Sequence, residues 1–250
     1  MTGTLVILPT YNERETLEAV VDGVLAASAD VEVLIVDDSS PDGTGDIANK
    51  LSAEHGRVNV LHRPSKRGLG SAYRNGFRWG LDRGFDVLVE MDADLSHDPA
   101  ALPQLLTGTS WADLVVGSRY VAGGRTENWP WHRRALSRGG NRYVQLVSGV
   151  PVHDATSGYR AFRREVLEEL DVESLRSEGY SFQLETVLHA WRKGFTIAEV
   201  PITFVERRSG ASKISRAIIL EALWRVLIWS FTGPRHAAPA HKRSVDTSGA

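Results

Sequence analysis

The sequence predicts an α/β protein with a mostly parallel sheet covered by helices on both faces. Short aliphatic runs alternate along the chain with stretches whose apolar residues recur at helical spacing. Those runs are apolar at nearly every position, which is typical of parallel strands buried on both faces. Polar residues cluster directly after several runs, at the edge where open sheets of this class bind ligands.

The first part of the chain supplies the strands and helices in order. The run TLVILP predicts a first strand, and Asn12 with Glu15 three residues later predicts a capped helix whose apolar stripe begins at Leu17. VEVLIVDD predicts a second strand, and a helix is expected over residues 44–54. VNVLHR and FDVLVE predict the third and fourth strands. Between them, RGLGSAY lacks the third glycine of a dinucleotide fingerprint and predicts a close-packed turn.

Composition excludes several classes of protein. With 250 residues and 42% hydrophobic content, the chain is long and apolar enough to bury a full core. The lack of cysteine excludes disulfides and thiolate sites. A net charge of -2 argues against nucleic-acid binding. Since neither a secretory signal nor a long apolar span is recognisable, we expect a protein made and kept in the cytoplasm.

Two aspartates follow the fourth strand in the segment MDADLS. In an extended segment Asp92 and Asp94 point to the same side while Ala93 points away. Two carboxylates this close repel each other unless a cation or a proton lies between them. Mg²⁺ held by one or two carboxylates and by substrate phosphates would meet that need. Carboxylates that cap their own loop are an equally good interpretation, and the spacing alone leaves both open.

Basic residues gather in two later segments. Residues 119–142 contain six arginines and a single acid, Glu127, and a second cluster comprises Arg207, Arg208 and Lys213. Arginine suits bidentate recognition of phosphate, and a lysine in a flexible segment supplies a point charge. The alternative is that these residues form a solvated basic face, as most clusters of basic residues do. Because the whole chain is net acidic, we favour phosphate binding.

The end of the chain predicts a separate element. Residues 214–231 carry an apolar helical face with two tryptophans, interrupted by charge, so they are too short and polar to span a bilayer. This helix can lie in a membrane interface or dock on the sheet, and both remain open. We therefore divide the chain into a main domain over 1–212, an amphipathic helix over 213–232 and a disordered tail over 233–250.

Eight motifs in order carry a family resemblance: LPTYNERETL, VDDSSPDGT, RGLGSAY, MDADLSHDP, GSRYV, ATSGYRAFRREVL, GYSFQLE and EVPITFVERRSGASK. Together they resemble the polyprenyl-phosphate mannosyltransferases, also called dolichol-phosphate mannose synthases, over residues 4–231. These are inverting glycosyltransferases of family 2 with the GT-A fold. The resemblance implies transfer of mannose from GDP-mannose to a polyprenyl phosphate with Mg²⁺ or Mn²⁺. It also implies a peripheral position at the cytoplasmic face of a membrane, reached directly or through a separate membrane subunit.

The resemblance also implies roles for individual residues, with Asp94, Arg119 and Lys213 as the catalytic set. Metal ligands would be Asp92, Asp94 and Ser96, the last standing where some members have Gln, and a hydroxyl reaches less far. Acceptor phosphate would meet Arg119, Arg133, Arg134 and Lys213. Donor contacts would come from Pro9, Tyr11, Glu13, Val36, Asp38, Asp92, Ala93, Asp94, Arg119, Arg207 and Lys213.

Three further positions are matched by the resemblance. Gln183 and Glu185 match a helix that faces the site, although a glutamate on a helix surface is ordinarily solvated. Asp154 is expected either to orient an acceptor-site residue or to cap the helix that follows it.

Other activities remain in view. A polyprenyl-phosphate glycosyltransferase using a UDP-sugar differs only in the pocket for base and sugar. A haloacid-dehalogenase-type phosphatase also places Asp-x-Asp at a strand end and uses the first Asp as nucleophile, but that motif usually follows the first strand. A membrane-docking subunit without activity would bind the same ligands and form no glycolipid.

Overall fold

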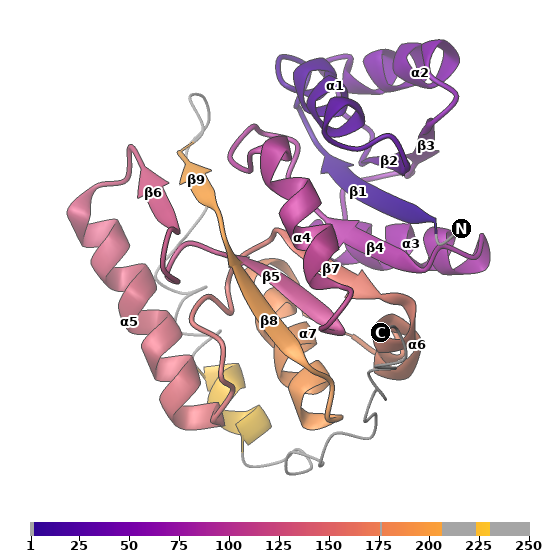
Figure 1. The fold of residues 1–250 in the computed structure, drawn as a ribbon. Coiled ribbons are helices and arrows are strands. Elements are labelled where there is room, and N and C mark those ends of the chain that lie inside the picture. The colour runs from indigo at the N-terminus through magenta and orange to yellow at the C-terminus, as the bar shows by residue number, and fades with distance from the viewer. Residues whose placement is uncertain (1–2, 176, 207–223, 231–250) are drawn as a thin grey trace, which may run out of the picture.

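A seven-stranded sheet of order β3-β2-β1-β4-β7-β5-β8 forms the centre of the molecule (Figure 1). The structure is a computed structural model that describes residues 3–175, 177–206 and 224–230. Neighbouring strands are parallel except at β7, which is antiparallel to both β4 and β5. The predicted mostly parallel sheet is thus confirmed. Its strands are β1 (Thr4–Thr10), β2 (Val31–Asp37), β3 (Val58–His62), β4 (Val87–Glu90), β5 (Leu114–Ser118), β7 (Arg160–Arg163) and β8 (Ile197–Pro201).

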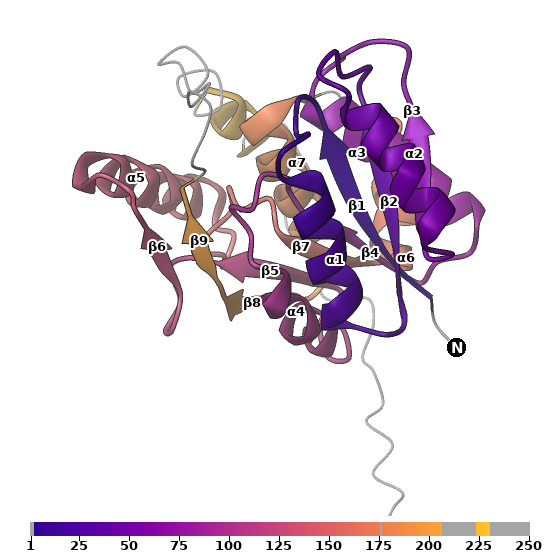
Figure 2. The same cartoon turned by 90° about the horizontal axis from the view of Figure 1, so that it is seen from above.

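Helices cover both faces of this sheet (Figure 2). One face carries α1 (Leu17–Ala27), α2 (Thr44–Glu54) and α4 (Leu102–Gly108), the last preceded by a short 3-10 turn, η1 (Pro99–Ala101). The other face carries α3 (Leu69–Asp82), α6 (Arg164–Leu170) and α7 (Gly179–Arg192). A small second sheet pairs β6 (Arg125–Glu127) with β9 (Thr203–Val205), and α5 (Trp131–Ser148) runs along one side of the molecule.

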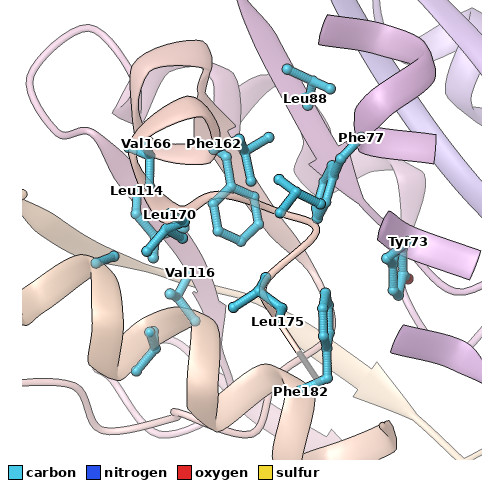
Figure 3. Close-up of a cluster of buried hydrophobic side chains, with 14 of the residues drawn as sticks. Tyr73, Phe77, Leu88, Leu114, Val116, Phe162, Val166, Leu170, Leu175 and Phe182 are labelled. Carbon is cyan, nitrogen blue, oxygen red and sulfur yellow. The ribbon is translucent and has the colours of Figure 1, made fainter. Parts of the chain in front are cut away.

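Alternation along the strands fills both layers of the core. Leu5 and Ile7 of β1 pack toward α3, whereas Val6 and Leu8 pack toward α1. On the α3 side Phe77 meets Phe162 edge to face, with ring centroids 5.5 Å apart (Figure 3). Because every central strand is buried on both faces, polar side chains are confined to the strand ends.

The start of α1 differs from the sequence prediction. Asn12 adopts a left-handed backbone conformation, φ 62°, and its N–H donates to Ser40 Oγ, so it does not cap the helix. The helix begins at Leu17, after Thr16. The loop after β1 is tied to the loop after β2, and this tertiary bond overrides the local capping signal.

The RGLGSAY segment is close-packed, as predicted, but only its first two residues form a turn, because α3 begins at Leu69. Gly68 has φ 94°, a conformation that favours glycine, and a Cβ on Gly70 would lie 2.6 Å from the main-chain oxygen of Ser177. The turn therefore brings the start of α3 against the segment before α7.

Part of the predicted C-terminal helix is described. Residues 224–230 are helical, with Val226 buried and Trp224 exposed, while 207–223 and 231–250 lie outside the described residues. Within the described ranges, every helix is too short or too polar to cross a bilayer.

β4 and β7 each place one ionisable side chain in the core. Glu90 and Arg160 are register partners on adjacent strands, and both are fully buried. Arg160 also donates to the main-chain oxygens of Gln183 and Ala155, at 2.7 and 2.6 Å. Burial raises the pKa of Glu90 from 4.5 to about 7, with Arg160 opposing that rise. Glu90 is the last residue of β4 and lies two residues before Asp92.

Glu90 should make the stability of the fold depend on pH. Between the ordinary pKa and about 7 the folded state holds a proton that the unfolded chain has lost, so stability falls as pH rises through this window. Replacing Glu90 by Gln removes this dependence. We expect the difference in Tm between wild type and Glu90→Gln to decline from about pH 5 to about pH 8, measured by thermal unfolding. The exposed Glu165→Gln serves as control, and a Tm difference for Glu90→Gln that does not change with pH would contradict the assignment.

Candidate active site

Loops after β1, β2 and β4 meet at one edge of the sheet. Each contains a non-glycine residue in the left-handed region: Asn12, Ser39 and Leu95, with φ between 55° and 62°. Such conformations are uncommon and are retained where the surrounding structure enforces them, often at functional sites. Backbone strain therefore coincides with the edge at which ligands bind in this class of sheet.

The loop after β4 presents the two predicted aspartates. Ala93 is buried in the core, and Asp92 and Asp94 on either side of it are half-buried. Asp94 accepts a hydrogen bond at 3.0 Å from the main-chain N–H of Ser96, two residues on. A carboxylate has further lone pairs for a ligand, so this bond holds Asp94 in place without saturating it.

Two buried side chains fix Asp92. The Tyr73 hydroxyl donates to Asp92 Oδ1 at 3.4 Å, and Nδ1 of His97 accepts from the Asp92 main-chain N–H at 3.4 Å. Burial lowers the pKa of His97 from 6.5 to about 4, so the ring is neutral near pH 7. With Nδ1 accepting, the proton of the neutral ring is assigned to Nε2.

The donor set at this loop suits a hard divalent cation. No group of three or more His, Cys, Asp or Glu that could hold a metal occurs in the described ranges. Two neighbouring carboxylates are ligands that suit Mg²⁺ or Mn²⁺, whose coordination phosphate oxygens and water would complete. Ser96 is buried, and its described contact with this site runs through its main-chain N–H.

A second charged pair closes the edge at β2 and β3. Nη1 of Arg63 lies 2.5 Å from Asp38 Oδ1, and Nη2 of Arg63 donates to Ser71 Oγ at 2.6 Å. Burial raises the pKa of Asp38, although Arg63 opposes the rise. The neighbouring Val36 is fully buried in the core, so its side chain offers no surface to a ligand.

The loop after β1 lies beside this pair. The ammonium group of Lys66 sits 3.5 Å from the centre of the Tyr11 ring. Glu13 accepts from Thr16 Oγ1 at 3.2 Å, and its N–H donates to Thr44. Pro9 is half-buried near the end of β1, opposite Val36 in register.

A buried ion pair lies after β5. Nε and Nη2 of Arg119 donate to the two oxygens of Asp154 at 2.6 and 2.5 Å, and the Arg119 main-chain N–H donates to the same carboxylate. Despite burial, Asp154 keeps the pKa of Arg119 above its usual value, and Arg119 keeps the pKa of Asp154 below its own. Glu199 accepts the Asp154 N–H at 2.9 Å. Asp154 thus holds the Arg119 side chain in its orientation, and the role of Arg119 in acceptor binding stays a prediction.

A row of rings joins the aspartates to the arginines. His97 packs on Phe204 at 5.3 Å, and Phe204 packs on Trp129 at 5.3 Å. The guanidinium of Arg119 lies 5.2 Å from the Trp129 ring and that of Arg133 lies 4.4 Å from it. We call His97, Phe204 and Trp129 the aromatic row. Arg119 also lies 5.4 Å from the Phe204 ring, so the aromatic row links the loop of the two carboxylates to the two arginines.

The remaining predicted basic residues are placed differently. Arg133 pairs with Glu206, and Arg134 is exposed on α5. Arg207, Arg208 and Lys213 lie outside the described residues. Of the four residues predicted to bind the acceptor phosphate, Arg119 and Arg133 lie over the ring of Trp129. Arg134 lies on α5, next to Arg133.

Sequence reasoning missed several residues of this site. Arg63 stands at the end of the third strand, so strand-end position alone could have identified it. Trp129 and Phe204 come from distant segments and carried no local signal. The ordinary expectation that Glu185 is solvated was wrong, because α7 is buried nearly all round and Glu185 accepts the Ser177 N–H at 3.1 Å.

Known proteins resemble this chain along most of its length. The family model for glycosyl transferase family 2 matches residues 5–171. Polyprenol monophosphomannose synthase of Mycolicibacterium smegmatis is 53% identical over 232 residues, 92% of this chain and 88% of that protein. Undecaprenyl-phosphate mannosyltransferase of Micrococcus luteus is 50% identical over 225 residues, 90% of this chain and 93% of that protein.

Solved structures share the fold at lower identity. Glucosyl-3-phosphoglycerate synthase of Mycobacterium tuberculosis, in complex with phosphoglyceric acid, aligns with a TM-score of 0.61 at 21% identity over 92% of this chain and 78% of that one. The mannosyltransferase PcManGT from Pyrobaculum calidifontis, in complex with GDP-Man and Mn²⁺, aligns with a TM-score of 0.54 at 17% identity over 91% and 72%. The GT-A fold expected from the motifs is confirmed, and the chain belongs to glycosyltransferase family 2.

Proposed function

We propose that this protein transfers mannose, with inversion, from GDP-mannose to a polyprenyl monophosphate. The names of two relatives at 50% identity or more support the acceptor class and the sugar. The observation that carries the proposal is the aromatic row, which links the loop of a carboxylate pair to a buried arginine. Membership of glycosyltransferase family 2 argues against the phosphatase alternative.

Asp92 and Asp94 are the residues that would hold Mg²⁺ or Mn²⁺. When bound there, the ion would neutralise the charge that develops on the departing diphosphate. Tyr73 and the neutral His97 hold Asp92 in its orientation, and the Ser96 amide holds Asp94. Asp38 with Arg63, and Tyr11 with Lys66, flank the space proposed for the nucleoside.

Arg119 and Arg133 are proposed to position the acceptor phosphate. A phosphate monoester is already anionic near neutral pH, so its oxygen needs orientation more than deprotonation before it attacks the anomeric carbon. Asp154 fixes Arg119 through two parallel bonds, so the cation is preorganised for that task. Arg134, Arg207 and Lys213 are proposed as further phosphate contacts. The site would then lie at the cytoplasmic surface of a membrane, where a lipid acceptor is found.

Product analysis tests the proposal directly. The full chain is incubated with a short-chain polyprenyl phosphate and labelled GDP-mannose or UDP-glucose in parallel. We expect mannose label in an organic-extractable, mild-acid-labile lipid. Label from UDP-glucose instead would reassign the donor. A chain that binds GDP but forms no glycolipid with either donor would be a docking subunit.

Asp94→Asn should abolish transfer while leaving the fold intact. The substitution keeps the shape of the side chain but removes the charge needed to hold a divalent cation, and we expect a loss of at least about 10²-fold in kcat. Asp98→Asn, four residues along and exposed, serves as the matched control. Transfer assays with unchanged circular dichroism and Tm check this. Full activity of Asp94→Asn at added Mg²⁺ would remove Asp94 from the metal site.

Asp154→Asn should raise the KM for the acceptor and destabilise the fold. The buried Arg119 would lose its compensating charge, at a cost of about 3–5 kcal/mol. Urea unfolding and initial rates at varied acceptor concentration measure the two effects.

A double variant separates alignment from stability. Arg119→Met with Asp154→Leu removes both charges together and should recover most of the lost stability, yet it should still fail to use the acceptor. Wild-type acceptor KM in Asp154→Asn, or normal transfer by the double variant, would show that Arg119 does not position the phosphate.

A further inference from the structure

A glutamate in the middle of β8 has its side chain buried. Glu199 lies between Ala198 and Val200, which both pack in the core on the α1 side of the sheet. Because side chains alternate along a strand, the Glu199 carboxylate is directed to the opposite face. Only 8% of that side chain is exposed. A carboxylate buried to this extent requires hydrogen-bond donors around it.

The donors to Glu199 come from two successive residues of one loop. Glu199 Oε2 accepts the main-chain N–H of His153 at 2.8 Å and lies 2.7 Å from Nδ1 of the same residue. Glu199 Oε1 accepts the main-chain N–H of Asp154 at 2.9 Å. Both oxygens of one buried carboxylate therefore hold the main chain of this loop at residues 153–154.

Asp154 connects this contact to Arg119. Its carboxylate accepts Nε and Nη2 of Arg119 at 2.6 and 2.5 Å, while its main-chain N–H is held by Glu199. Arg119 directly follows β5, and β5 pairs with β8 so that Val116 is the register partner of Glu199. Asp154 itself lies between α5 and β7, outside any strand or helix. A loop residue thus bridges two side chains that adjacent strands hold in place.

We infer that Glu199 is a positioning residue for the acceptor: it fixes the main chain at Asp154 and thereby aims Arg119. The inference rests on the proposed function, which assigns the acceptor phosphate to Arg119. A bidentate pair is directional, so a shift of the Asp154 main chain would turn the guanidinium with it. Asp92 is held by Tyr73 and His97 instead. Loss of Glu199 should therefore affect the acceptor and spare the nucleotide.

Glu199→Gln tests this role. The amide keeps the shape of the side chain, but its NH₂ group cannot accept a main-chain N–H, so one of the two bonds to the loop is lost. We expect the KM for a short-chain polyprenyl phosphate to rise about tenfold or more, because small errors in placement are costly. The Kd for GDP and the number of binding sites, both measured by calorimetry, should match wild type.

Glu32→Gln is the matched control. Glu32 is also a strand glutamate that accepts a hydrogen bond, from Asn59 at 3.0 Å, but it lies near the amino end of β2, away from the site. Its acceptor KM should equal that of wild type. A wild-type acceptor KM in Glu199→Gln would overturn the inference. So would a parallel loss of GDP affinity or of binding sites, which would indicate general damage to the fold.

A double variant shows whether Glu199 acts through Arg119. Arg119→Lys keeps the cation but loses the bidentate geometry that Asp154 enforces. Two residues that act through one contact have non-additive effects. Adding Glu199→Gln to Arg119→Lys should therefore raise the acceptor KM no further. Full additivity of the two substitutions would overturn the inference.

A spectroscopic measurement separates this inference from the proposed function. With isotope-labelled arginine, nuclear magnetic resonance follows exchange of the Arg119 Nε–H with water, and Arg119→Lys identifies its signal. Glu199→Gln should speed this exchange about tenfold or more, because the bond to Asp154 opens more often. If wild type forms no glycolipid but the exchange responds, the proposed function fails and the positioning of Arg119 by Glu199 stands. Normal transfer by wild type with unchanged exchange in Glu199→Gln would overturn the inference alone.

Discussion

The buried ion pair between Arg119 and Asp154 is the constraint on which the site depends. Burial of a guanidinium is costly, and here a carboxylate that faces it in bidentate geometry offsets that cost. The Asp154 carboxylate also accepts a hydrogen bond from the main-chain N–H of Arg119. The main-chain N–H of Asp154 donates in turn to Glu199 of β8. Three segments far apart in sequence are locked together around one cation. Trp129 and Phe204 lie against the Arg119 guanidinium, and Phe204 packs on His97, whose Nδ1 lies 3.7 Å from a carboxylate oxygen of Asp92.

The fold could be predicted because its central strands are recognisable from their aliphatic sequences. In β1 and β2 nearly every residue is aliphatic, and the structure buries them on both faces. The same rule located Asp92 and Asp94 at the edge of the sheet and placed Ala93 inward, because alternation in an extended segment is a local property. The helix start at Leu17 escaped prediction because Asn12 is held by Ser40, a partner 28 residues away.

The part of the site that contains the arginines was less predictable, for a physical reason. The sequence revealed an excess of arginine between residues 119 and 142, but it could not tell which guanidinium is buried against a carboxylate and which is solvated. Arg119 is buried and Arg134 is exposed because Asp154 and Trp129, which lie elsewhere in the sequence, contact Arg119. Likewise, Glu185 resembled a surface residue because its burial is imposed by the packing of α7 on the sheet and not by its own neighbours.

The antiparallel β7 has a consequence for how the molecule assembles. β7 lies between β4 and β5 in the sheet and pairs with both, and the segment directly before it carries Asp154. Asp154 therefore reaches Arg119, at the end of β5, only when β7 is paired in its place in the sheet. Any change that weakens the pairing of β7 would also release the guanidinium of Arg119 from its carboxylate.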